Sequence, residues 1–141
     1  MARIEVEETI TIAHSAARTW ALLGDFGANH RWMPAVTASA LQGSGIGATR
    51  RLSMDGGGYV DERLETRDEA GMSYRYSMFG GSVPVRNYES TLTVVPEGQG
   101  SRVRWSASFE PVPDAPLDAR ALIQEVYRSS LQNAKALLER D

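Results

Sequence analysis

The sequence predicts an α+β domain in which a curved, seven-stranded antiparallel sheet wraps around one long C-terminal helix, with two short helices after the first strand. One observation is the stretch 116–140, where apolar residues recur at the three-and-four spacing of one helix face. Another is a series of short segments that alternate apolar and polar residues, separated by glycine-rich turns. Such short turns favour antiparallel neighbours, and the apolar face of the sheet must be buried against another layer. The C-terminal helix is long enough to cover it.

The first strand is predicted by four apolar residues that alternate with polar ones, namely Ile4, Val6, Ile10 and Ile12. Glu8 falls on their face, and we expect it at a strand end in water or at a bulge. His14 or Ser15 can cap a short helix that ends at Gly24, in the left-handed conformation that glycine favours. A further helical turn around Trp32 ends at a proline, and we expect this tryptophan to line an entrance to the interior.

The remaining six strands begin near Val36, and turn-forming runs separate them at 43–45, 55–58, 69–71, 80–81 and 96–100. Their alternation defines one inner face, made up of Arg50, Leu52, Met54, Val60, Glu62, Leu64, Met72, Tyr74, Tyr76, Met78, Tyr88, Ser90, Leu92, Val94, Val103, Trp105, Ala107 and Phe109. The opposite face consists almost entirely of Arg, Glu, Thr and Ser, so we expect it to face water.

The C-terminal helix carries its apolar stripe at Ile123, Val126, Tyr127, Leu131, Ala134, Leu137 and Leu138. Asp114 or Asp118 can cap its start, and Pro116 is tolerated in the first turn because a backbone N–H there would have no helical partner. Ser130 lies one step from the stripe, so it and Tyr127 bring hydroxyl groups to the covering face.

Composition narrows the class of protein. With 141 residues and 42% hydrophobic content, the chain is expected to form a single domain over residues 1–141. Its net charge of −3 comes from interspersed charges, without the basic stripe that nucleic acid requires. There is no cysteine, and His14 and His30 lie far apart, so we expect neither a metal nor an organic cofactor.

No secretory signal and no apolar run of the ~20 residues that span a membrane is visible, so we expect a cytoplasmic protein. The sequence leaves open whether it is a monomer or a homodimer.

Polar residues on the predicted inner face indicate a functional site. An isolated buried charge is costly, so this many polar groups favour a hydrated cavity between sheet and helix. Ligand pockets are commonly apolar with a few convergent polar groups. We therefore expect a hydrophobic small-molecule ligand to contact Trp32, Met33, Leu52, Tyr74, Tyr76, Met78, Tyr88, Ser90, Trp105, Ile123, Tyr127 and Ser130.

Each of these polar residues also has a purely structural interpretation. Buried tyrosines commonly pack their rings and donate the hydroxyl to a backbone carbonyl. Arg50 and Glu62 lie on consecutive strands, so they can form an internal ion pair or anchor a ligand. As candidate catalytic residues, Glu62 would act as acid or base, and Arg50 would stabilise an enolate. A hydrolytic triad is not expected, because no Gly-x-Ser-x-Gly motif occurs.

The order of elements and several motifs resemble the START-related superfamily of helix-grip proteins, and within it the bacterial polyketide cyclase/dehydrase branch. The resemblance covers nearly the whole chain and rests on Trp20, Tyr74 and the motifs at 32–34, 47–50, 62–65, 84–90 and 103–105. It implies a helix-grip fold and a ligand-binding domain with an internal cavity.

Plant abscisic acid receptors, distant members of this superfamily, are similar at 62–64, 80–81 and 87–90. In those receptors the residues that match Glu62, Tyr88 and Ser90 face the hormone, which implies pocket positions for them here. The receptors' carboxylate-anchoring lysine aligns near Thr37, and their gate-loop sequence is replaced by residues 55–58. Abscisic acid is therefore not expected as the ligand.

Three functions compete on these grounds. The first is binding of an apolar or aromatic, polyketide-like or lipid-like molecule between the sheet and the terminal helix. The second is an enzyme of the cyclase or dehydratase type that uses the same cavity for acid–base chemistry. The third is a stress or co-chaperone-like role, which the lack of an exposed apolar stripe in the sequence disfavours.

Overall fold

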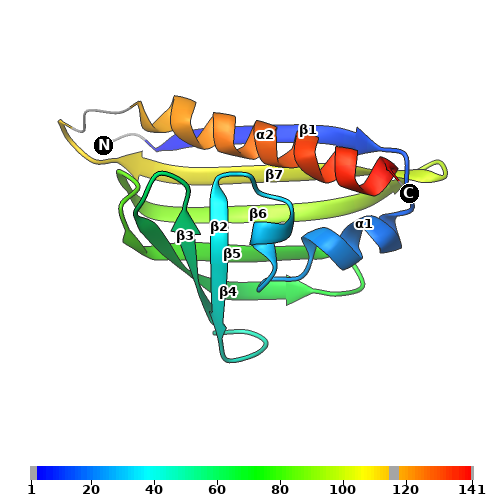
Figure 1. The fold of residues 1–141 in the computed structure, drawn as a ribbon, viewed down its shortest axis with the longest axis horizontal. Coiled ribbons are helices and arrows are strands. Elements are labelled where there is room, and N and C mark those ends of the chain that lie inside the picture. The colour runs from blue at the N-terminus through cyan, green and yellow to red at the C-terminus, as the bar shows by residue number, and fades with distance from the viewer. Residues whose placement is uncertain (1–2, 115–117, 141) are drawn as a thin grey trace.

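The computed structural model describes residues 3–114 and 118–140 (Figure 1). Its elements in chain order are β1 (Ile4–Ile12), α1 (Ala16–Leu23), the 3-10 helix η1 (Asn29–Arg31), β2 (Val36–Gln42), β3 (Thr49–Met54), β4 (Tyr59–Asp68), β5 (Ser73–Gly81), β6 (Val85–Glu97), β7 (Gly100–Pro111) and α2 (Ala119–Glu139). The predicted fold class is confirmed, with seven strands, two short helices after β1 and one long C-terminal helix.

All seven strands form one antiparallel sheet in the order β1-β7-β6-β5-β4-β3-β2. The first strand pairs with the last, with Val6 opposite Ala107, while β2 forms the other edge. Between them, α1 and η1 carry the chain from one edge of the sheet to the other. Figure 1 shows the sheet curving beneath α2, which runs lengthwise over β1 and β7.

The inner face predicted from alternation is the buried face of the sheet. On β7, Val103, Trp105 and Phe109 are at most 1% exposed, while Arg102 and Arg104, which alternate with Val103 and Trp105, face water. The same alternation buries Tyr88, Ser90, Leu92 and Val94 on β6. At the margins of this face, Met54, Met72 and Met78 are only partly buried.

The long helix α2 lies with one stripe against the sheet. Its buried residues are Ala119, Ile123, Tyr127, Ser130, Leu131, Ala134 and Leu138. The helix begins at Ala119 rather than at residue 116, because Asp118 is its cap and accepts a hydrogen bond from the Ala121 N–H at 3.2 Å. Pro116 lies outside the described residues. Of the stripe predicted from spacing, Val126 and Leu137 are only partly buried.

The short helix α1 shows one departure from expectation. Ser15 caps it as predicted, accepting a hydrogen bond from the Arg18 N–H at 3.2 Å. Gly24 ends the helix with φ −81°, however, so the predicted left-handed conformation is wrong. A Cβ atom at this position would lie 2.6 Å from Cδ2 of Trp20. Glycine is needed here because the indole ring packs against the backbone, not because of a turn.

A bulge on β6 sets the direction of an inner-face tyrosine. Arg86 lies opposite Glu110 and Glu89 opposite Ser108, so β6 has one residue more than β7 across this interval. Asn87 absorbs the extra residue with φ 52°, a conformation that asparagine tolerates. Tyr88 consequently faces the interior, although Arg86, two residues earlier, is exposed.

Candidate functional site

A cavity of about 70 Å³ lies between α2 and the inner face of the sheet. Most of the residues predicted to form the site line it, namely Met33, Arg50, Leu52, Glu62, Tyr76, Met78, Tyr88, Trp105, Ile123 and Tyr127. Sequence reasoning missed several further lining residues, namely Asn29, Val36, Met54, Val60, Val83, Leu122 and Val126. Val126 and Leu122 lie on or next to the predicted helix stripe, and Met54 and Val60 lie on the predicted inner face of the sheet, whereas Asn29 belongs to a 3-10 turn whose sequence gives no such periodic signal.

The remaining predicted site residues lie outside the cavity lining. Trp32 is 0% exposed and packs against Trp105 with ring centroids 5.3 Å apart, so the expectation that it lines an entrance is wrong. Ser130 is also 0% exposed, and its hydroxyl has no hydrogen-bond partner among the described residues. Tyr74 packs against Trp20 and Phe26. Ser90 lies directly behind the lining and contacts it through hydrogen bonds.

Arg50 and Glu62 form the ion pair that their neighbouring strands suggested. The two residues lie opposite each other on β3 and β4 and are 1% and 4% exposed. Nε of Arg50 donates to Oε1 of Glu62 at 2.8 Å, and NH2 lies 2.7 Å from the same oxygen. Both contacts fall on one carboxylate oxygen, which leaves Oε2 as an acceptor beside the cavity.

The rest of the Arg50 guanidinium is enclosed by protein. NH1 donates to the Phe26 carbonyl at 2.9 Å and to Oδ1 of Asn29 at 2.5 Å. The rings of Phe26 and Tyr76 have their centroids 3.9 and 4.8 Å from Cζ. Burial alone would lower the pKa of Arg50, but Glu62, Tyr74 and Tyr76 together raise the pKa above its ordinary value, so the side chain stays charged.

For Glu62 the effect of burial on the pKa outweighs that of its partner, and the pKa is raised. Burial raises its pKa, and the positive charge and hydrogen bonds of Arg50 oppose that shift. Because two N–H groups converge on Oε1, the geometry fits an ionised carboxylate held in a fixed orientation.

A cluster of hydroxyl groups forms another wall of the cavity. The Tyr127 hydroxyl contacts those of Tyr88 and Ser90, the latter at 2.7 Å. The Tyr76 hydroxyl is farther away, 3.4 Å from that of Tyr88. Nε1 of Trp105 donates into the cluster, to Ser90 at 3.0 Å and to Tyr76 at 3.2 Å. Burial raises the pKa of Tyr76 to about 12, so its hydroxyl remains a hydrogen-bond donor at neutral pH.

Glu8, the other acidic residue predicted on the inner face, does not join this group. It is half-buried opposite Trp105 on the β1 edge, and Nε2 of Gln124 lies 3.4 Å from its Oε2. Glu8 is the middle residue of β1, and the pairing of β1 with β7 has no bulge, so the expectation of a strand end or a bulge is wrong; the side chain is nevertheless only half-buried.

The inner cavity adjoins an outer hollow where β5 and β6 separate. The two strands pair from Ser73 opposite Thr93 as far as Ser77 opposite Glu89, and β5 then continues along β4 alone. Met78 and Val83 lie in this separated segment and line both the inner cavity and a hollow on the outside.

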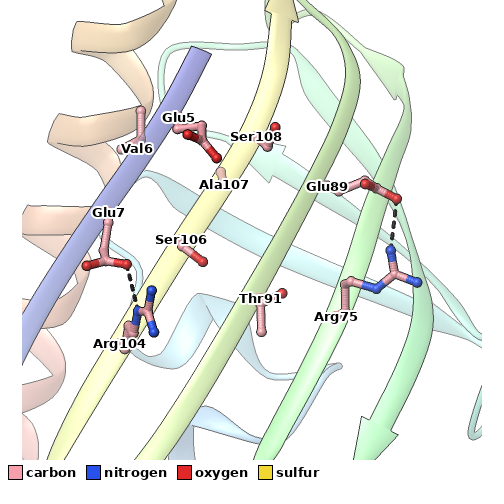
Figure 2. A pocket seen from close by; sticks show the side chains of 10 residues that line it. All are labelled: Glu5, Val6, Glu7, Arg75, Glu89, Thr91, Arg104, Ser106, Ala107 and Ser108. Atoms are coloured by element: carbon pink, nitrogen blue, oxygen red, sulfur yellow. Dashed lines mark hydrogen bonds and ion pairs between the residues drawn. The ribbon is translucent and has the colours of Figure 1, made fainter. Parts of the chain in front are cut away.

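A larger hollow of about 520 Å³ lies on the outer face of the sheet (Figure 2). Four of its charged residues form two ion pairs, the first between Glu7 and Arg104 at 2.6 Å. Arg75 likewise pairs with Glu89 at 2.9 Å. All four side chains are largely exposed, so this hollow lacks the buried, convergent polar groups of a ligand site. The inner cavity is therefore the better candidate.

Within residues 3–114 and 118–140, no three His, Cys, Asp or Glu side chains lie together in a way that could hold a metal ion. None of the helices in that part of the chain has the length and apolar character required to cross a membrane.

Comparison with known proteins agrees with this architecture. A crystal structure of a Bacillus thuringiensis protein superposes with a TM-score of 0.87 at 29% identity, covering 96% of this chain and 98% of that one. The protein XoxI from Bacillus cereus gives the same TM-score and identity, with 98% and 96% covered. The Arabidopsis thaliana MLP-like protein 423 is 37% identical over 51 residues, and the match spans 35% of this chain and 33% of that protein.

The family model described as "Polyketide cyclase / dehydrase and lipid transport" matches residues 3–139. The match covers nearly the whole chain and agrees with the helix-grip architecture and the inner cavity. The chain therefore belongs to the polyketide cyclase/dehydrase and lipid transport family.

Proposed function

We propose that the chain binds an apolar or aromatic small molecule in the cavity between α2 and the sheet. The observation that carries this proposal is the convergence of the Arg50–Glu62 pair and the tyrosine hydroxyls on an otherwise apolar hollow. Buried polar groups of this kind are costly unless they serve a ligand or one another. The family description, which includes lipid transport, supports the same function.

Ligand entry has to widen the cavity. Its volume of about 70 Å³ is below the roughly 300–1,000 Å³ typical of small-molecule sites. The side chains nearest the separated strands are the flexible Met78 and the partly buried Val83. Methionine adapts its shape easily, so movement of these two side chains offers the extra volume at small cost.

Binding is favoured over acid–base catalysis by the state of Glu62. A general acid or base works best when it is free to exchange a proton with the substrate. Here Oε1 accepts a hydrogen bond from Nε of a permanently charged arginine and lies 2.7 Å from its NH2, an arrangement suited to holding a ligand group in place.

The test uses N-phenyl-1-naphthylamine, an uncharged dye that fluoresces in apolar surroundings. The wild-type protein should bind it saturably at one site. Leu52→Phe fills the cavity and should abolish binding in a folded protein, because Leu52 lines it. Leu92→Phe is the matched control: Leu92 is buried on the same face outside the lining, so this variant should lose stability but keep the dye.

Absence of saturable dye binding by the wild-type protein would refute the proposal. Equal dye binding by folded Leu52→Phe and Leu92→Phe would place the binding site elsewhere.

A further inference from the structure

We propose that the cavity selects uncharged ligands that present a hydrogen-bond acceptor to the Tyr76 hydroxyl and a hydrogen-bond donor to the Glu62 carboxylate. This inference rests on the proposed binding function and narrows its ligand class to neutral molecules that carry both a carbonyl oxygen and a hydroxyl group.

The first argument concerns charge. Among the described residues that line the cavity, Arg50 and Glu62 are the only charged ones, and they neutralise each other. Three N–H groups of Arg50 donate to Glu62, Phe26 and Asn29, and NH2 also lies 2.7 Å from Glu62. An anionic ligand would therefore enter a site whose cation is already paired, and it would lose its hydration without compensation.

The second argument follows the hydroxyl protons. Ser90 donates its proton to the Ser106 carbonyl at 2.8 Å, so in its contact with Tyr127 it must act as the acceptor. The Tyr127 hydroxyl therefore donates its hydrogen bond to Ser90. Tyr88 then has to donate to Tyr127, since each hydroxyl carries a single hydrogen.

This order leaves Tyr76 at the free end of the chain. Its hydroxyl is 3.4 Å from that of Tyr88 and 3.5 Å from that of Tyr127, both long for hydrogen bonds between hydroxyl groups. It also receives the Trp105 N–H at 3.2 Å, which polarises its own proton outward. Tyr76 is therefore the hydroxyl best able to donate to a ligand oxygen in the cavity.

The third argument concerns Glu62. The contacts with Arg50 all fall on Oε1, so Oε2 remains as an acceptor on a residue that lines the cavity. Glu62 and Tyr76 lie on the adjacent strands β4 and β5, and Leu64, two residues after Glu62, lies opposite Tyr76. One small molecule can thus engage the acceptor and the donor together.

Four naphthalene probes of similar size test the inference by calorimetry at slightly acidic pH, where naphthol hydroxyls stay protonated. They are 6-acetyl-2-naphthol, with both groups, 2-acetyl-6-methoxynaphthalene, without the donor, 6-ethyl-2-naphthol, without the ketone, and the anion 6-hydroxy-2-naphthoate. The first should bind tightest, and each of the two neutral analogues about tenfold more weakly, the loss expected for one hydrogen bond. The anion should bind at least about tenfold more weakly than the first.

Three variants show which residues cause the differences in probe affinity. Tyr76→Phe should weaken both ketone probes about tenfold and leave 6-ethyl-2-naphthol unchanged. Tyr74→Phe is the matched control: Tyr74 is buried on the same strand outside the lining, so no probe should change affinity. Glu62→Gln leaves the Arg50 charge unpaired and should raise the affinity for the naphthoate at least about tenfold. If Glu62→Gln does not fold, the probe affinities of the wild-type protein and of Tyr76→Phe still test the proposed ligand selectivity.

Equal affinity of the wild-type protein for the naphthoate and the hydroxyketone, or an equal loss for every probe in Tyr76→Phe, overturns the inference. Binding of N-phenyl-1-naphthylamine shows whether the proposed ligand selectivity or the proposed binding function is wrong. If the dye binds and the probes are not discriminated, only the ligand selectivity is wrong. If neither the dye nor any probe binds, the binding function itself is wrong.

Discussion

Trp105 on β7 and Tyr127 on α2 stack face to face, with ring centroids 3.8 Å apart and planes inclined by 6°. The two rings are 1% and 2% exposed, so they form a buried contact that attaches the long helix to β7, the strand next to the β1 edge of the sheet. Tyr127 also contacts the hydroxyls of Ser90 and Tyr88. A single residue of α2 thus contributes both to packing and to the polar wall of the cavity.

Substitutions at Tyr127 should separate these two roles. Tyr127→Phe keeps the stack but leaves Tyr88 without its acceptor, and should lower the free energy of unfolding by about 1–3 kcal/mol. Tyr127→Ala also removes the ring and should cost about 3–5 kcal/mol. Urea unfolding measures both values. Equal losses would mean that the stacked ring adds nothing to the attachment of α2.

Ser130 should be a site where removing a polar group stabilises the protein. Its buried hydroxyl has no partner among the described residues, so Ser130→Ala should raise the free energy of unfolding by about 1 kcal/mol. Ser129→Ala is the control on the same helix: it makes the same change in helix propensity but loses a hydrogen bond to the Val126 carbonyl. Thermal unfolding should rank Ser130→Ala above the wild type and above Ser129→Ala; the reverse order would indicate that the Ser130 hydroxyl is satisfied.

Gly24→Ala should be destabilising despite an ordinary helical backbone. The added methyl group would lie 2.6 Å from the Trp20 ring, so the indole has to move, at about 1–3 kcal/mol. Trp20 also donates its Nε1–H to Oε1 of Glu69 at 2.7 Å, and the displacement should disturb that bond. Urea unfolding gives the loss, and tryptophan fluorescence reports the shift of the ring. Wild-type stability with unchanged fluorescence would show that the ring has room.

Most of the fold could be predicted because alternation on a strand and three-and-four spacing on a helix directly report which residues are buried. This is why the inner face was placed correctly and why Arg50 was expected to meet Glu62. Alternation does not report which strands are neighbours, so the pairing of β1 with β7 could not be derived. The bulge at Asn87 depends on a local conformation that has no periodic signal.

The site was harder to predict than the fold, because a buried face contains both packed core and cavity. Tyr76 and Ser130 both carry hydroxyls on predicted buried faces, yet only Tyr76 lines the cavity. Trp32 lies in a helical turn that ends at a proline, which suggested a position at an entrance, but it packs against Trp105 and is fully buried. Only three-dimensional packing decides between these outcomes.

Stability at acidic pH should depend on Glu69. Its carboxylate accepts hydrogen bonds from Arg67 and from the Trp20 indole, which lower the pKa of Glu69 from the ordinary 4.5 to about 2. The folded state therefore holds this proton less tightly than the unfolded state. Its contribution to stability is present above pH 4.5 and is lost as the pH falls toward about 2.

Urea unfolding of the wild type and Glu69→Gln across this pH range should show a stability difference that is largest near neutral pH and closes in acid. In an Arg67→Met background the same substitution should have a much smaller effect, because the main cause of the shift is absent. A difference that does not change with pH would show that Glu69 acts through packing.

The final prediction concerns the buried ion pair, and the same two strands carry its control. Arg50 and Glu62 lie opposite each other on the inner face, and Arg51 and Asp61 form the adjacent pair on the outer face at 2.8 Å. Arg50→Met or Glu62→Gln alone leaves a buried partner unpaired and should lower the free energy of unfolding by about 3–5 kcal/mol. The double variant leaves no unpaired charge and should lose less stability than the sum of the single changes, with a coupling free energy of up to about 3 kcal/mol. The outer pair is open to solvent, so the cycle of Arg51→Met and Asp61→Asn should show far weaker coupling that salt suppresses further. Equal coupling for the two pairs would mean that water reaches Arg50 and Glu62 freely, which would remove the basis for a cavity that discriminates by charge.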